Sequence, residues 1–148
     1  MTFLEWNDAL LVGEREMDDD HRRLVVLVNE IADAAAAARR ASSVSEAIAR
    51  LVDATEDHFG REERMIRDSG DPNAIPHARD HGMLLSQLKI LSTLIDDETV
   101  EAGTDLVRFI RGWLVSHVRT HDLALARHLG VWRAAAAAEG RPGRDQAA

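Results

Sequence analysis

The stretch SVSEAIARLVDATEDHFGREERMIRDS, residues 43–69, decides the fold of this chain. Its stripe positions recur every three to four residues, at Ile48, Leu51, Val52, Thr55, Phe59 and Ile66. This spacing is typical of an amphipathic α-helix. Ser43-Val44-Ser45-Glu46 has the form of a capping box that begins the helix. The run DSGDPN, residues 68–73, ends it.

The same periodicity predicts three more helices around this one. The first begins near Asp18, which is expected to cap it, and ends around residues 39–40. The third has Pro76 in its first turn and reaches about Ile95, and the fourth follows a polar connection at residues 96–99 and runs to about Val131. We therefore predict an all-α protein, an antiparallel up-down-up-down four-helix bundle with an irregular N-terminal arm over residues 1–17.

Length and composition are consistent with one domain. The chain has 148 residues, which suits a single hydrophobic core, and we place the domain at residues 1–132 with a disordered tail at 133–148. A net charge of −8 disfavours nucleic acid as a partner. The absence of cysteine excludes disulfides, thiolate nucleophiles and cysteine-ligated metal centres. No signal peptide or membrane-spanning segment is predicted, so we expect a cytoplasmic protein without a membrane partner.

Histidines are distributed over all four predicted helices. His58 and Glu62 lie four residues apart, as do His77 and His81, so each pair meets above one helical turn and can hold a metal ion. One such pair is a weak signal, but two pairs with single histidines on the other two helices form a stronger one. Buried imidazoles need a compensating partner, and metal ligation supplies it.

Two other kinds of metal site are tested against this pattern. Ferritin-like carboxylate centres need Glu-x-x-His twice, and no histidine here has a glutamate three residues before it. Zinc peptidases need His-Glu-x-x-His, and no His-Glu dipeptide occurs. The predicted site is therefore rich in nitrogen donors and poor in carboxylates.

The pattern resembles the hemerythrin family, most closely the single-domain bacterial hemerythrins, over about residues 3–130. That family has a lone histidine, then His-x-x-x-Glu, then His-x-x-x-His, then a histidine followed five residues later by aspartate. The matching positions here are His21, His58, Glu62, His77, His81, His117 and Asp122. The surrounding sequence also matches, at Trp6, Gly13, Asp18, Asn29, Phe59, Glu63, Pro72, Trp113 and Leu114.

The last helix leaves two candidates for its second ligand. At about 100° per residue, Asp122 lies about 140° around the helix from His117, whereas His121 lies about 40° away. Spacing alone therefore favours His121. The resemblance favours Asp122, and the apolar stripe through Val118, Leu125 and Leu129 drifts toward that side. We expect His121 to lie beside the ligands or to face solvent, and His128 to lie on the surface near the helix end.

The resemblance implies a cofactor of two non-haem iron ions joined by a bridging oxo or hydroxo group. His77, His81 and His117 would hold one iron, His21 and His58 the other, and Glu62 and Asp122 would bridge them. Dioxygen would bind at the two-histidine iron, in an apolar pocket whose expected walls are Leu24, Phe59, Trp113, Leu114 and Val118. The family carries tyrosines where Asp71 and Leu125 stand here.

The implied function is reversible dioxygen binding, as an oxygen carrier, store or delivery protein without catalytic residues. Two alternatives remain at this point. One is an oxygen- or redox-sensing module that acts through a protein partner, which the sequence does not identify. The other is a di-iron enzyme that consumes peroxide or nitric oxide, and a weak oxidase or peroxidase side activity is compatible with a carrier.

Overall fold

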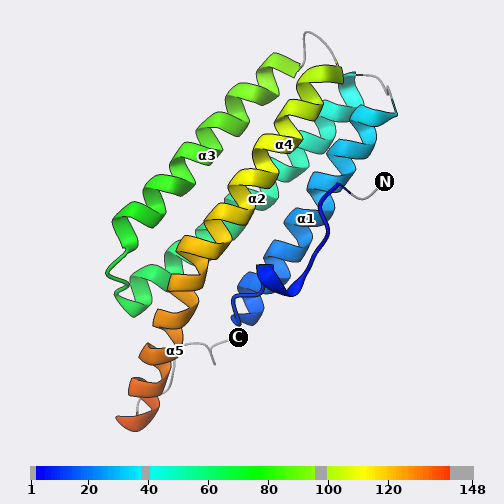
Figure 1. Cartoon of the computed structure of the whole chain (residues 1–148). Helices are drawn as coiled ribbons and strands as arrows, with labels where there is room; N and C mark the ends of the chain where they lie inside the picture. Colours follow the sequence, from blue (N-terminus) through cyan, green and yellow to red (C-terminus); the bar gives the residue numbers. More distant parts are fainter. Residues whose placement is uncertain (1–2, 38–40, 96–99, 141–148) are drawn as a thin grey trace.

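The computed structural model describes residues 3–37, 41–95 and 100–140, and none of these forms a strand (Figure 1). The helical elements are, in order, η1 (Asp8–Leu10), α1 (Arg15–Ala36), α2 (Ala41–Ser69), α3 (Ala74–Ile95), α4 (Val100–His117), η2 (Val118–Asp122) and α5 (Leu123–Ala138). η1 is a short 3₁₀ turn, and η2 is π-helical. Because the backbone stays right-handed helical on both sides of η2, α4, η2 and α5 form one continuous helix.

The four long helices run alternately in opposite directions (Figure 1). α1 packs against α2 and α4, and α3 packs against the same two helices. The helices therefore surround one interior in the order α1, α2, α3 and α4. The predicted up-down-up-down four-helix bundle is confirmed.

Two predicted helix starts are wrong. α1 begins at Arg15, so Asp18 is buried in its first turn, where its carboxylate accepts the backbone N–H groups of Val12 and Gly13. Asp18 thus binds the backbone of the N-terminal arm and does not cap α1. α2 begins at Ala41, so Ser43 lies within it and is not its cap. The expected helix end at residues 39–40 and the polar connection at 96–99 lie outside the described residues.

The arm follows the outside of the bundle beside α1 (Figure 1). The Asn29 side chain accepts the N–H groups of Phe3 and Leu4 at 2.9 and 2.8 Å, and it donates to the Leu4 carbonyl. Gly13 has a φ of 85°, a conformation that other residues rarely adopt. This turn leads the arm into α1.

The C-terminal segment differs from the expected tail. α5 continues to Ala138, six residues beyond the domain boundary expected at residue 132. Arg133 forms an ion pair with Glu14 at the start of α1, so this part of α5 is attached to the bundle. Residues 141–148 of the expected tail lie outside the described residues.

The buried apolar residues form two clusters. The larger cluster fills most of the interior and draws on all four helices. The smaller one consists of Met17, Ile66, Leu125 and Leu129, near the start of α1, the end of α2 and the first turns of α5. Within the described residues, no helix combines the length and apolarity that crossing a bilayer requires.

Candidate metal centre

α1 begins, α2 ends, α3 begins and α4 ends toward the same end of the bundle (Figure 1). The donor side chains lie near that end. The antiparallel topology explains this, because His21 lies early in α1, His58 late in α2, His77 early in α3 and His117 at the end of α4. Residues nearly 100 positions apart in sequence therefore meet at one level. All seven sequence-predicted donors are buried there.

The donors form two overlapping groups. One contains Glu62, His77, His81, His117 and Asp122, and the other contains His21, His58, Glu62 and Asp122. Within each group the ligand atoms lie within 4.8 Å of one another. The structure thus brings together three histidines on one side and two on the other, with both carboxylates common to the two groups.

The two shared carboxylates face both groups at once. Glu62 places Oε1 3.1 Å from His58 Nε2 and Oε2 3.1 Å from His81 Nε2. Asp122 places Oδ2 2.9 Å from His21 Nε2 and Oδ1 2.9 Å from His117 Nε2. Each carboxylate therefore offers one oxygen to the two-histidine group and the other to the three-histidine group. Either group of donors could therefore hold a metal ion with both carboxylates within reach.

Hydrogen bonding leaves several of these atoms unsatisfied. His21 Nε2, both oxygens of Glu62 and Asp122 Oδ2 are buried and have no hydrogen-bond partner of acceptable geometry among the described residues. His21 Nε2 and Asp122 Oδ2 are only 2.9 Å apart, yet they do not form a hydrogen bond of acceptable geometry. Buried polar atoms without partners are costly. Nitrogen and carboxylate donors of this kind fit divalent transition metals, so the residues present suit a dinuclear centre.

Outer carboxylates orient three of the five imidazoles. Nδ1 of His58 lies 3.0 Å from Asp20, and Nδ1 of His117 lies 2.5 Å from Asp80. Nδ1 of His81 lies 3.5 Å from Glu63, a weaker contact. A proton on Nδ1 leaves the Nε2 lone pair directed inward, which is the tautomer that a metal ligand needs.

The charges around the donors shift their pKa values in opposite directions. Burial opposes charge on His58, yet Glu62, Asp20 and Asp122 raise its pKa to about 10. Burial likewise opposes charge on His77, and the carboxylates of Asp122 and Glu62 raise its pKa to about 9. The histidines around Glu62 and Asp122 overcome burial and lower the pKa of both carboxyl groups. At neutral pH the two protonated imidazoles therefore offset the charge of the two buried carboxylates.

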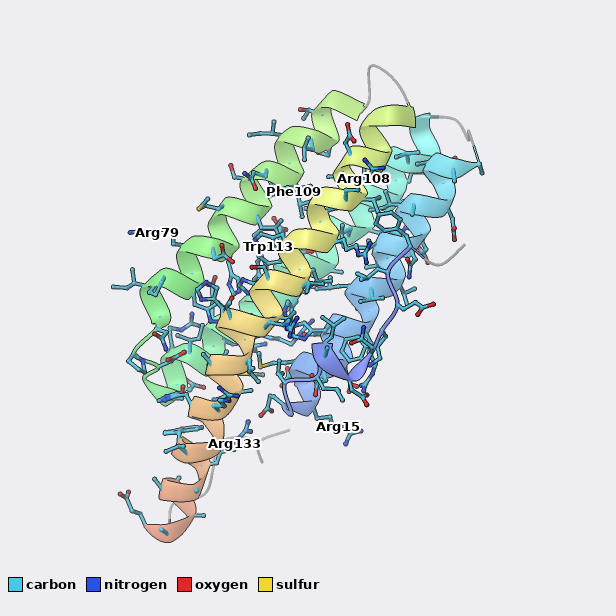
Figure 2. The ribbon with its side chains drawn as sticks, in the orientation of Figure 1. Arg15, Arg79, Arg108, Phe109, Trp113 and Arg133 are labelled. Atoms are coloured by element: carbon cyan, nitrogen blue, oxygen red, sulfur yellow. The ribbon has the colours of Figure 1, made fainter. Side chains whose placement is uncertain are left out.

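The expected apolar walls lie against the donors. Phe59 stacks on His81 with ring centroids 3.7 Å apart, and Trp113 stacks on His117 at 4.4 Å. Figure 2 labels Trp113 on α4, between the ribbons of α3 and α4. Leu24, Leu114 and Val118 are buried in the larger apolar cluster, which Trp113 also joins. Phe59 and Trp113 therefore cover the rings of two donors, and the other three residues belong to the same apolar cluster as these two aromatic rings.

The π-helical segment brings Asp122, and not His121, into the two larger donor groups. In η2 the backbone hydrogen bonds span five residues instead of four, so residues five apart lie above one another. Asp122 consequently faces the same interior as His117 and is 0% exposed, whereas His121 lies at the edge with 29% of its side chain exposed. The count for a regular α-helix brings His121 closer to His117 than Asp122 because it assumes a constant turn of about 100° per residue.

His128 does not lie near a helix end, as the sequence suggested. α5 continues ten residues past it, and its Nε2 contacts the Ser69 carbonyl at 3.0 Å. Ser69 is the last residue of α2, whose terminal carbonyls lack helical partners. His128 therefore caps α2.

A four-helix bundle with two overlapping histidine and carboxylate groups in its interior, each of which could hold a metal ion, defines a cation-binding helical bundle. The chain belongs to the hemerythrin HHE cation binding domain family, whose model matches residues 12–129.

Several relatives share this architecture. The chain is 32% identical over 129 residues to a bacteriohemerythrin of Stenotrophomonas maltophilia (strain R551-3), covering 85% of this chain and 81% of the relative. It is 31% identical over 117 residues to a myohemerythrin of Riftia pachyptila, covering 79% and 86%. A crystal structure of wild-type hemerythrin superposes with a TM-score of 0.79 at 25% identity, covering 86% of this chain and 98% of that one.

Proposed function

We propose that this protein binds dioxygen reversibly at a pair of non-haem irons and serves as an oxygen carrier, store or delivery protein. The observation that carries the proposal is the unequal number of donors in the two groups. The three-histidine group offers five donor residues, and the two-histidine group offers four. A metal held by the smaller group keeps a coordination position open for a small ligand.

The seven buried donors would hold the two irons, with Glu62 and Asp122 shared between them. The ferrous pair, when bound, supplies the electrons that dioxygen takes up on binding and returns on release. The two carboxylates offset half of the four positive charges that two ferrous ions bring into the interior. The five histidines complete the donor set without adding charge once they are deprotonated.

The apolar residues give the site its selectivity. Leu24, Phe59, Leu114 and Val118 are each less than 5% exposed and belong to one apolar cluster, in which the Phe59 ring stacks on the donor His81. We expect this cluster to keep bulk water away from the donors. Dioxygen is small and uncharged and passes through packed side chains more easily than water or anions do. Exclusion of water and anions favours release of unchanged dioxygen over irreversible oxidation of the metal.

Spectroscopy of the iron-loaded protein tests the function. We expect metal analysis to give two irons per chain after anaerobic loading with ferrous ion. Exposure to oxygen is expected to produce a visible charge-transfer band that disappears under argon and returns on re-exposure. Irreversible bleaching, or sustained consumption of peroxide or nitric oxide with turnover, would instead favour the enzyme alternative.

A pair of histidine variants tests the assignment of ligands. We expect His77→Ala, which removes a donor from the three-histidine group, to lose iron. We expect His121→Ala to keep two irons per chain at equilibrium, because its imidazole lies outside both groups. Iron retained in the first variant and lost in the second contradicts the ligand set.

A further inference from the structure

The buried centre has no donor at the surface. None of the seven candidate ligands is more than 2% exposed, so an ion in solvent cannot reach them directly. We propose that Asp80 and His121 form a cation-entry site, which captures a divalent cation at the surface and passes it to the buried donors. The proposal rests on the proposed function, because it supposes that the buried centre takes up iron.

A third group of donor atoms supports the entry site. Ligand atoms of Asp80, His117 and His121 lie within 4.8 Å of one another. The Asp80 and His121 side chains are 30% and 29% exposed, whereas that of His117 is 1% exposed. The group therefore reaches from solvent to the buried centre.

His117 separates the outer donors from the inner ones. Its Nδ1 faces Asp80, and its Nε2 lies 2.9 Å from Asp122 in the interior. The His121 ring lies 5.2 Å from the ring of His117 and the same distance from that of His77, on which it stacks. The His117 ring therefore lies between a cation held by Asp80 and His121 and the buried carboxylate of Asp122.

The chemistry of the outer donors suits transient capture. One carboxylate and one imidazole attract a divalent transition ion, and water completes its shell. The three-histidine group offers five donor residues, so it binds the ion more tightly than the two outer donors do, and the ion moves from the outer site to the inner one. His121 and Asp122 are also consecutive residues of η2, so the outer and inner donors belong to one turn of the helix.

Other carboxylates beside the centre are less suitable. Asp20 is 16% exposed, but Arg61 holds both of its oxygens at 2.8 Å, and the guanidinium repels a cation. Glu63 is exposed but contacts only His81, at 3.5 Å, and no second imidazole outside the centre lies near it among the described residues.

Asp80 is not neutralised in this way. Its neighbour Arg79 points away from the bundle (Figure 2). No arginine or lysine of the described residues lies within ion-pair distance of the Asp80 carboxylate. Among the candidate entry points, Asp80 alone combines an uncompensated charge with a half-exposed imidazole, that of His121.

The test measures the rate at which the full-length, metal-free protein takes up ferrous ion without oxygen. Aliquots are quenched at successive times with a coloured ferrous chelator that captures only unbound ion. We expect His121→Phe, which keeps a ring on His77 but has no donor atom, to load about tenfold more slowly. We expect His121→Glu, which restores a donor, to load close to the wild-type rate. Both variants are expected to reach two ions per chain.

His128→Phe provides the matched control. This variant removes another half-buried imidazole from the same long helix. The His128 imidazole contacts the Ser69 carbonyl and not the metal centre. We expect wild-type loading kinetics for this variant. Wild-type kinetics in His121→Phe overturn the entry site, as does equal slowing in His128→Phe. A lower final stoichiometry in His121→Phe makes His121 a resident ligand and also overturns it. Failure of the wild-type protein to bind iron overturns the proposed function itself.

Discussion

At the residue scale, the carboxylates around the ligands show a regular pattern. Asp20 precedes His21 in sequence but contacts His58 on the neighbouring helix, and Asp80 precedes His81 but contacts His117. In both cases the donor residue points inward, while the carboxylate beside it reaches the neighbouring helix. These outer contacts fix the tautomers of the imidazoles that they touch.

The sequence did not reveal these contacts. Helical spacing shows which residues share a face of one helix, so the pairs His58–Glu62 and His77–His81 were visible. The contacts of Asp20 and Asp80 cross between helices, and they depend on the rotation of each helix about its own axis. Glu63 was noted only as a match to the family, without its contact to His81.

Removal of the outer carboxylate of His58 is predicted to weaken metal binding. Asp20→Ala leaves Nδ1 of His58 without its acceptor, so we expect the affinity for iron to fall by about 10- to 100-fold. Asp20→Asn keeps an acceptor oxygen and is expected to fall between this variant and the wild type. Competition with a chelator measures the affinities.

Asp19→Ala is the matched control, because Asp19 is exposed and pairs with Arg22 away from the centre. We expect wild-type affinity for this variant. A purely structural role for Asp20 predicts a lower unfolding midpoint for the metal-free protein with unchanged iron affinity, the opposite of our expectation.

Proton release is predicted to accompany metal uptake at neutral pH. Burial opposes the charge, but the nearby carboxylates raise the pKa of His58 to about 10 and that of His77 to about 9, so both are protonated at pH 7 in the metal-free protein. A metal ion needs both imidazoles neutral. We therefore expect about two protons to leave per loaded chain, and the apparent affinity to increase as the pH rises from 7 to 9.

Calorimetry in buffers of different ionisation enthalpy measures the number of protons released. A heat of binding that is independent of the buffer at pH 7 contradicts the prediction.

At the element scale, the π-helical segment determines which residue joins the centre. A regular helix through residues 118–122 would turn His121 inward and Asp122 aside, and no local sequence signal marks the wider turn. Thr120 donates its hydroxyl to the Ser116 carbonyl at 2.6 Å. The residue identities alone did not predict this turn, and only the resemblance and the drift of the apolar stripe favoured Asp122.

Changes of length in this segment are predicted to have opposite consequences. Deletion of the exposed Arg119 leaves the aspartate four residues after His117 instead of five, and in a regular α-helix that spacing still places both on one face. We expect the deletion variant to stay folded and to bind two irons. Insertion of one alanine after Arg119 rotates everything beyond it by about 100°. We expect the insertion variant to lose iron.

The insertion also affects packing, because it turns Leu125 and Leu129 away from the smaller apolar cluster. Loss of two buried leucines from a core costs several kcal/mol. Metal analysis and thermal unfolding measure both effects. Equal iron content in the two variants would show that η2 does not position Asp122.

At the scale of the whole molecule, the fold was predictable because each helix carries its own apolar stripe and the connections are short. The separation of the interior into two apolar clusters on either side of the donors was not predictable. A stripe identifies buried positions along one helix, but the level at which Met17 meets Ile66 and Leu129 depends on how the helices slide past one another. The position of the donors between these clusters couples metal binding to the stability of the entire bundle.

Metal loading is therefore predicted to raise the thermal stability of the protein. The donors come from all four long helices, so the unfolded chain cannot assemble them, and binding stabilises only the folded state. At ferrous concentrations about a thousandfold above the dissociation constant, binding adds about 4 kcal/mol, which corresponds to an increase in Tm of roughly 10 °C for a chain of this size. Anaerobic calorimetry of metal-free and loaded protein measures the difference. The increase is expected to disappear in Glu62→Ala, which removes a carboxylate common to both donor groups. An increase that persists in this variant would arise from binding elsewhere on the acidic surface and would separate stability from the buried centre.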